Sequence, residues 1–514
     1  MKIKTLLLSL ALMGCVMSYA QSHNSALYKV PARKEIRHKV KHQPEILVEP
    51  SAATRASGEY IMQEFPTLGE IRGIVLLVAF QDVPFSMSDD SIRTLLQNRY
   101  GGVDYTEEVS HQGYSAVDGG TIGVRASVPG SARDYFHKQS MGKFTPHFDV
   151  IGPVTLDNPR SYYGANNGSG NDKNARAMVT EACRKAYEQG FTDFADYDND
   201  GDGVVDCVYV VYAGSDEAQT AIEECIWAHA HTVSLQLDNG IKVGRYACSG
   251  ELFVDLAGMP AGIGTFVHEF SHILGLPDYY NTKADDFTMD VWSVMDYGLY
   301  NRGGFVPCAY TAFERYSLGW IPMSDLDAPA TMSIGTTDEE GRGYRIYTAQ
   351  PVDNVVADTA SFYLVETIRK EGWNRYAAAE GLLISEVTYK ASAWQGNTVN
   401  TEVNHRHCVV PADNVYSYDN PTGQLFGTKN HEFTLTTTPA SITQFGAAMD
   451  KPLTDIRYDA ATGRTTFHFR GGSGMGEHII QNSKVSNSYD LLGRPHYSPS
   501  SGIYIQNGKK LLHD

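Results

Sequence analysis

The sequence of 514 residues lacks two features: the excess of positive charge typical of nucleic-acid-binding proteins and the long hydrophobic runs of membrane-spanning proteins. Its 42 Lys and Arg residues are outnumbered by 60 Asp and Glu residues, so the formal net charge is −18. This balance argues against nucleic-acid binding, which depends on Lys and Arg contacts to phosphate. The mean hydropathy is −0.30 and no late apolar run is long enough to cross a bilayer, so we expect no integral membrane span.

Cysteine is also scarce, and its spacing excludes one kind of metal site. None of the seven cysteines forms a C-x-x-C pair, so a zinc cluster built on cysteine is not expected. Removal of an N-terminal segment with Cys15 leaves an even number, and an oxidising compartment permits disulfides. Buried apolar positions are the alternative, which we favour for Cys207 at the start of a predicted strand. The remaining cysteines are Cys183, Cys207, Cys225, Cys248, Cys308 and Cys408.

Residues 1–20 have the pattern of a secretory signal peptide. Two lysines precede a short, mostly apolar stretch, and small residues around Ala20 allow cleavage before Gln21. We therefore expect a protein that is exported and is secreted or held at the cell surface. Lipidation at Cys15 remains an alternative, although the Met before the adjacent Gly fits that motif poorly.

The rest of the chain divides into four segments that differ in composition and hydrophobic pattern. Residues 21–68 carry basic patches without periodicity and are interpreted as a propeptide or linker. Over residues 69–325 predicted helices alternate with predicted strands, which indicates an α/β layer structure. Residues 326–472 show short alternating segments between Gly, Asp and Asn turns, which is typical of an antiparallel β-sandwich. A Gly-rich hinge and a C-terminal tail fill residues 473–514.

Five elements of the α/β segment are predicted individually. The continuous apolar run over residues 73–80 favours a strand buried on both faces. Further strands are expected over residues 208–212 and 225–231. One helix begins after a capping box at residue 131 and ends near residue 142, and another covers residues 174–189 before a stopping Gly.

The chemistry is concentrated in an H-E-x-x-H motif formed by His268, Glu269 and His272 on an apolar helical background. The i, i+4 spacing places both imidazoles on one face of a helix, within reach of one metal ion. Neutral imidazole suits Zn²⁺, and three protein ligands plus a water make a catalytic site. Glu269 lies beside the pair and is the candidate general base for that water.

The continuation of the motif supplies a third candidate ligand. Gly275 allows the helix to end in a left-handed residue, so that the chain doubles back and brings Asp278 to the metal. The full pattern is H-E-x-x-H-x-x-G-x-x-D, which random sequence produces far less often than H-E-x-x-H alone. The alternative, a core helix with satisfied histidines, is correspondingly disfavoured.

Met295 and Tyr297 lie where metzincin-type zinc peptidases place a turn beneath the histidines. Such a Met is usually core packing on its own, but downstream of this motif we interpret it as that turn. Tyr297 is a candidate hydrogen-bond donor to a developing oxyanion, and a packed aromatic ring is an equal alternative.

Several segments together resemble the immune inhibitor A family of secreted bacterial metallopeptidases. The resemblance implies an α/β zincin-like (metzincin-like) catalytic domain followed by an antiparallel β-sandwich-like domain. It also implies zinc held by two His and one Asp, a Glu base and peptide-bond hydrolysis. The short N-terminal segment departs from the family and leaves the mode of latency open. The resemblance covers roughly residues 70–470 and rests on His268 to Asp278, Trp292 to Asp296, Ala312 to Arg315, Ser131 to Phe136, Gly152 to Val154, Phe362 to Glu366 and Gly381 to Ile384.

An acidic loop is the second candidate cation site. Asp198, Asp200, Asp202 and Asp206 occupy positions 1, 3, 5 and 9 of an EF-hand-like loop, with Gly203 at position 6. Position 12 is a tyrosine and a strand follows, so an EF-hand domain is excluded. Because close carboxylates repel one another without a cation, we expect structural Ca²⁺ here, with a solvated acidic turn as the alternative.

The tail within residues 473–514, from Tyr489 to Arg494 and from Gly502 to Lys510, resembles a C-terminal sorting signal of the type IX secretion system, which implies outer-membrane secretion machinery as a partner. A terminal β-hairpin is the alternative.

The leading hypothesis for the whole chain is a secreted zinc endopeptidase acting on polypeptide substrates through a zinc-activated water. A cell-surface protein- or glycan-binding factor with a vestigial zinc site, and a narrow mucin or glycopeptide peptidase, remain as alternatives. The sequence indicates no oligomeric state.

Overall fold

The computed structural model describes residues 65–97, 107–114, 121–191, 193–253, 260–348 and 359–471, together with four short strands between residues 488 and 513. The predicted signal peptide and nearly all of the predicted propeptide or linker lie outside these ranges. Within the described part of the chain, no helix combines the length and the apolar character needed to cross a membrane.

The first region is built on a mixed sheet whose central strands are parallel. The strand order is β4-β1-β6-β8-β5, in which all neighbours run parallel, and β7 pairs antiparallel with β8. This arrangement confirms the predicted α/β class. The strands are β1 (Gly69–Ala79), β4 (Phe144–Thr155), β5 (Val204–Val205), β6 (Val208–Ser215), β7 (His229–Gln236) and β8 (Lys242–Leu252).

Both faces of this sheet are covered, as β1 illustrates. Val75 and Leu77 enter one core with α8, whereas Ile74 and Leu76 enter another with α6. The prediction of a strand buried on both faces is confirmed. The helices of this region are α3 (Asp89–Leu96), α4 (Ala132–Gln139), α5 (Arg160–Tyr163), α6 (Ala175–Glu188), α7 (Glu217–Thr220) and α8 (Gly264–Ile273), and a hairpin joins β2 (Glu107–Tyr114) to β3 (Thr121–Val128).

Local signals explain most element boundaries. The capping box at α4 is present, because Ser131 accepts from the backbone of Asp134 and its own N–H donates to the Asp134 carboxylate. The strand predicted to begin at residue 225 is wrong at its start, since β7 begins at His229. Cys225 instead closes a turn by donating its N–H to the carbonyl of Ile222.

All six cysteines of the described residues are free and buried. Burial raises the pKa of the Cys207 thiol and of the Cys183 thiol, which keeps both protonated at neutral pH. The interpretation of Cys207 as a buried apolar residue is therefore confirmed.

The second region contains two further sheets. One is mixed, with the order β14-β13-β12-β11-β9, because β9 runs parallel to β11; the other is antiparallel, with the order β10-β16-β15. Their strands are β9 (Met323–Asp325), β10 (Ala330–Ile334), β11 (Gly343–Tyr347), β12 (Thr359–Ile368), β13 (Gly381–Lys390), β14 (His407–Val409), β15 (Leu453–Asp459) and β16 (Arg464–Phe469). The helix α9 (Ala312–Ser317) precedes β9, α10 (Thr337–Glu340) lies between β10 and β11, and α11 (Ala391–Gln395) lies between β13 and β14.

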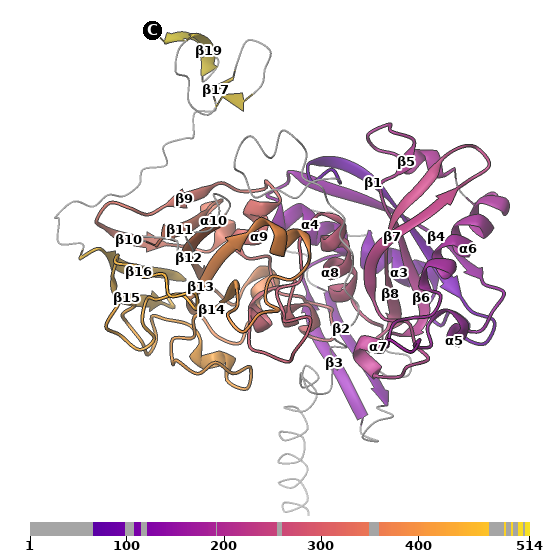
Figure 1. Cartoon of the computed structure of the whole chain (residues 1–514), viewed down its shortest axis with the longest axis horizontal. Helices are drawn as coiled ribbons and strands as arrows, with labels where there is room; N and C mark the ends of the chain where they lie inside the picture. The colour runs from indigo at the N-terminus through magenta and orange to yellow at the C-terminus, as the bar shows by residue number, and fades with distance from the viewer. Residues whose placement is uncertain are drawn as a thin grey trace, which may run out of the picture.

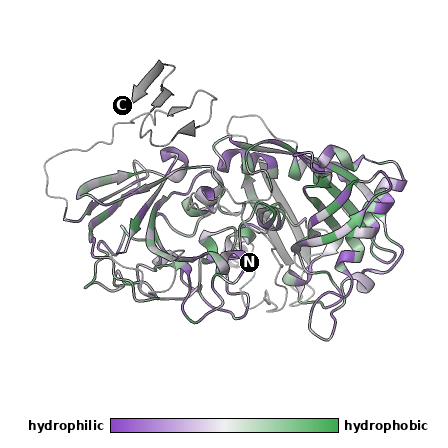
Figure 2. Cartoon of the chain, turned by 45° about the horizontal axis from the view of Figure 1, so that its top comes forward, coloured by the Kyte–Doolittle hydropathy of each residue, from purple (hydrophilic) through white to green (hydrophobic). Residues whose placement is uncertain are grey.

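The five-stranded sheet joins the two regions. On β12, Tyr363 and Val365 pack into the core shared with β16, whereas Phe362 and Leu364 pack into the core that contains α8. Figure 1 accordingly shows α8 between the main sheet on the right and the second region on the left. Hydrophobic residues concentrate along the strands of the main sheet (Figure 2). The second region thus shares a continuous hydrophobic core with the helix that carries the H-E-x-x-H motif.

The C-terminal strands form a sheet of their own with the order β18-β17-β19-β20. They are β17 (Ser488–Tyr489), β18 (Pro495–His496), β19 (Gly502–Gln506) and β20 (Lys509–His513). The interpretation of this tail as a sorting signal stays a prediction.

Candidate active site

The helix α8 presents its motif inside the protein. His268, Glu269 and His272 are each 5% exposed, and every residue of α8 is buried. Gly264 at the start of α8 permits this close packing, since a Cβ there would overlap the backbone oxygen of Leu299. The sequence reason for a buried helix is the apolar background of the motif, in which the two imidazoles and the carboxylate are the only ionisable groups and the Ser271 hydroxyl is satisfied by the Val267 carbonyl.

The end of α8 turns the chain back toward its own histidines. Gly275 has a φ of 103°, its N–H donates to the carbonyl of His272, and the N–H of Leu276 donates to the carbonyl of Ser271. These two bonds form a Schellman motif, in which a left-handed residue ends the helix. The predicted turn at Gly275 is therefore present, and it brings Asp278 to the same side as the imidazoles.

We expect Gly275→Ala to lower the free energy of unfolding by about 1–2 kcal/mol, because a Cβ is strained at this φ. The same change should weaken zinc binding, since the turn sets the position of Asp278. Urea denaturation and zinc titration measure the two effects. Gly190→Ala is the matched control, because Gly190 follows α6 with a φ of 68° and should lose stability without losing zinc affinity. Unchanged zinc affinity in Gly275→Ala would contradict this account of the turn.

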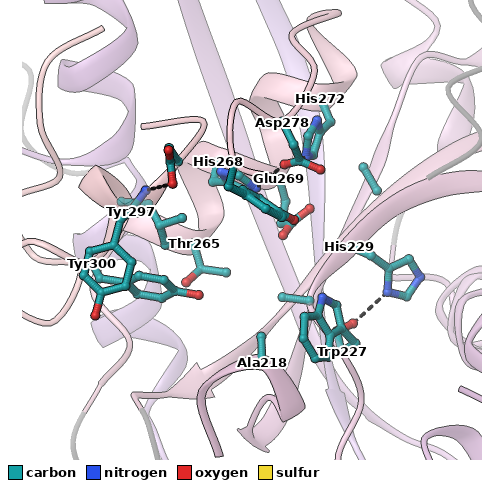
Figure 3. A pocket seen from close by; sticks show the side chains of 15 residues that line it. Ala218, Trp227, His229, Thr265, His268, Glu269, His272, Asp278, Tyr297 and Tyr300 are labelled. Carbon is teal, nitrogen blue, oxygen red and sulfur yellow. Dashed lines mark hydrogen bonds and ion pairs between the residues drawn. The ribbon is translucent and has the colours of Figure 1, made fainter. Parts of the chain in front are cut away.

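The three predicted ligands converge on one point. Nε2 of His268 and Nε2 of His272 each lie 3.2 Å from Oδ1 of Asp278, whose side chain is 2% exposed. Figure 3 shows these groups facing one another at the wall of a pocket. Burial raises the pKa of the Asp278 carboxyl, but the adjacent His272 and His268 lower it more, so the net shift is downward. Among the described residues, these three are one of two groups whose geometry suits a metal ion.

The hydrogen bonds around the cluster fit a cation. Nδ1 of His268 bonds to the carbonyl of Val294 at 2.8 Å, and Nδ1 of His272 bonds to the carbonyl of Leu276 at 2.7 Å. A carbonyl only accepts, so each Nδ1 carries a proton, and Nε2, the ring atom that faces Asp278, is the one that can give a lone pair to a metal. Oδ1 of Asp278 accepts no hydrogen bond from the described residues. Three lone pairs meeting in a buried site are stabilised by a divalent ion, and two imidazoles with one carboxylate suit zinc.

Glu269 lines the same pocket as the three ligands. Burial is the largest cause that raises its pKa, His268 opposes the shift and the nearby Asp278 adds to it, so the pKa is raised to about 8. A carboxyl whose pKa lies close to the working pH can both accept and return a proton.

The predicted Met turn contacts the site through its backbone. The carbonyl of Met295 accepts from the N–H of Tyr279 at 2.8 Å, and the preceding Val294 carbonyl holds His268. The Met295 side chain is fully buried in the core that contains α8. Tyr297 lines the pocket beside Tyr300, at 5.4 Å between ring centroids. Figure 3 places both rings on the opposite side of the pocket from Asp278, and the role of Tyr297 stays a prediction.

Two tyrosines of this pocket, Tyr300 and Tyr280, were not predicted from the sequence. The Tyr280 ring stacks on His268, at 6.4 Å between centroids and 23° between planes. Burial and the charges of Asp278 and Glu269 raise the pKa of its hydroxyl well above the usual value. Its place two residues after the third ligand was the available signal, but only the folded turn shows which of two adjacent tyrosines faces the site.

The acidic loop gathers three of its four predicted carboxylates. Ligand oxygens of Asp198, Asp200 and Asp202 all lie within 4.8 Å of one another. Oδ2 of Asp206 instead accepts from the backbone and the side chain of Asn199, at 2.8 and 2.7 Å. The loop therefore presents a three-carboxylate group, with Asp206 fixing the loop through Asn199.

The fold and the His–His–Asp cluster define a zinc metallopeptidase domain. The family described as immune inhibitor A peptidase M6, catalytic domain, matches residues 68–321. Residues 68–321 are thus a catalytic domain of the immune inhibitor A type of M6 peptidase.

Two relatives show the extent of the similarity. The pre-pro-metalloprotease PrtV of Vibrio cholerae serotype O1 is 26% identical over 326 residues, which is 55% of this chain and 34% of the relative. Immune inhibitor A of Bacillus thuringiensis subsp. alesti is 27% identical over 232 residues, which is 38% of this chain and 33% of the relative. The chain thus spans about a third of the length of these curated relatives.

Proposed function

We propose that this protein is an exported zinc-dependent endopeptidase that hydrolyses peptide bonds of extracellular proteins. The convergence of two Nε2 lone pairs and one carboxylate oxygen beside Glu269 is the observation that carries this proposal. When bound, a zinc ion polarises the scissile carbonyl and lowers the pKa of its water to about 7.

The residues of the chain have distinct roles in this mechanism. His268, His272 and Asp278 hold the ion, and the carbonyls that accept from the two histidines fix their orientation. Glu269 takes the proton from the attacking water and later donates it to the leaving amine. Tyr297 donates a hydrogen bond to the developing oxyanion of the scissile carbonyl.

A digest of casein by the purified protein, with and without a zinc chelator, tests the function. We expect cleavage that the chelator abolishes and added zinc restores. A binding factor with a vestigial site would leave casein intact under all conditions. A narrow glycopeptidase would cleave mucin and spare casein.

We further propose that the acidic loop binds Ca²⁺ through Asp198, Asp200 and Asp202, with the predicted fourth ligand Asp206 holding the loop through Asn199. The proximity of the first three carboxylates supports a cation there. Calcium should raise the temperature of unfolding, and Asp200→Asn should abolish that rise, as measured by scanning calorimetry with and without calcium. Zinc affinity should be unchanged by Asp200→Asn. An equal calcium response in both proteins would contradict the site.

The organisation of the chain is part of the proposal. A signal peptide over residues 1–20 directs export, and residues 21–68 are a propeptide or linker. Residues 69–325 form a metzincin-like catalytic domain. Residues 326–472 form a β-sandwich-like domain, and the hydrophobic core between the two sheets of this second region supports that assignment. Residues 473–514 act as a sorting tail for outer-membrane secretion machinery.

A further inference from the structure

A loop of the second region reaches the metal ligands. It follows β13 and comprises α11 and residues 396–406, which lead into β14. Its Asn397 and Asn400 are fully buried. The family match ends at residue 321, so this loop lies outside the matched catalytic domain.

Asn397 makes two hydrogen bonds to Asp278. Its Oδ1 accepts from the Asp278 backbone N–H at 2.7 Å, and its Nδ2 donates to Oδ2 of the Asp278 carboxylate at 2.7 Å. The orientation of the amide is determined by these partners, because a flipped amide would place N–H against N–H and oxygen against oxygen. The two carboxylate oxygens of Asp278 therefore have different partners. Oδ2 accepts a hydrogen bond from the Asn397 amide, and Oδ1 faces the two imidazoles.

The loop that carries Asn397 is also anchored through Asn400, three residues further on. The φ of Asn397 is 50°, a left-handed conformation that Asn tolerates better than most residues. Nδ2 of Asn400 donates to the carbonyls of Tyr279 and His407, at 2.7 and 2.6 Å. The rings of Tyr279 and His407 pack edge to face at 4.6 Å between centroids. The residue after Asp278 is therefore fixed to the same loop.

We propose that Asn397 is a positioning residue for the metal ligand Asp278, supplied to the metal centre by the second region of the chain. This inference rests on the proposed zinc site. Hydrogen bonds of this kind orient a ligating carboxylate, and their loss typically costs about 10–100-fold in metal affinity. The metal centre then reaches full affinity only when the second region is docked on the catalytic domain.

Two substitutions at Asn397 separate the effect of its side-chain amide from that of its left-handed backbone conformation. Asn397→Gly removes the side chain and tolerates a φ of 50° without strain. Asn397→Asp keeps the size and the acceptor but places a carboxylate oxygen against Oδ2 of Asp278. In the full chain, competition with a zinc chelator should show affinity about 10–100-fold lower for both variants. With cobalt in place of zinc, Asn397→Asp should change the visible absorption spectrum, because the carboxylate ligand is reoriented.

Asn374→Ala is the matched control. Asn374 also links the two regions, since its Oδ1 accepts from the Ala309 N–H at 3.0 Å, but it lines a different cavity. This variant should keep the zinc affinity and the cobalt spectrum of the unsubstituted protein.

The outcomes distinguish this inference from the proposed function. Absence of zinc binding by the unsubstituted protein would refute the function itself. Zinc binding by that protein, with affinities of both Asn397 variants within about twofold of it, would overturn the inference alone, since the predicted loss is much larger. An equal loss in Asn374→Ala would also overturn it, because docking in general would then be responsible. Circular dichroism establishes folding, and if Asn397→Gly does not fold, Asn397→Asp decides the question.

Discussion

Glu269→Gln should reduce kcat/KM for casein-derived peptides by about 10²–10⁴-fold while leaving zinc bound, because it removes the proton acceptor and none of the ligands. The substitution is nearly isosteric. Burial raises the pKa of Glu269 to about 8, so the site already accommodates a neutral group of this shape. Steady-state kinetics and metal analysis on the same preparation measure the two properties.

Glu181→Gln is the control for this substitution. Glu181 belongs to α6, which packs on the opposite face of the main sheet from α8. Its variant should keep full activity. Retention of activity by Glu269→Gln would refute the assignment of the general base, whereas loss of zinc together with activity would show that Glu269 supports the ion.

Asp278→Ala should abolish the stabilisation of the protein by zinc. A ligand that binds only the folded state adds about 2.7 kcal/mol at 100 times its dissociation constant, so the unsubstituted protein should gain about that amount. The variant retains two imidazoles but no carboxylate to complete the site, and it should gain almost nothing at the same zinc concentration. Thermal unfolding with and without zinc measures the difference.

Zinc should also stabilise Asp278→Ala less than it stabilises the Asn397 variants. Those variants should bind zinc more weakly and still be stabilised at high zinc concentration. Full zinc stabilisation of Asp278→Ala would contradict the assignment of the third ligand.

The ligand triad was predictable because each step in it is local. Helical periodicity places His268 and His272 on one face, and Gly275 supplies the left-handed residue that the reversal requires. The strand over residues 73–80 was predictable for the same kind of reason, since a short unbroken apolar run rich in β-branched residues favours a strand covered on both faces.

What the sequence could not predict depends on contacts between distant segments. Asn397 lies 119 residues from Asp278, and no local pattern distinguishes it from other asparagines. The start of β7 was misplaced because a turn closed by Cys225 and an apolar strand look alike in composition. The sequence could not show which of Tyr279 and Tyr280 faces the pocket, because packing and not spacing determines the side on which each ring lies.

Diffraction from crystals of the full chain at the zinc absorption edge tests the central claim most directly. We predict one anomalous peak about 2.0–2.2 Å from Nε2 of His268, Nε2 of His272 and Oδ1 of Asp278. A peak elsewhere, or these three side chains directed away from one another with no peak between them, would contradict the proposed peptidase.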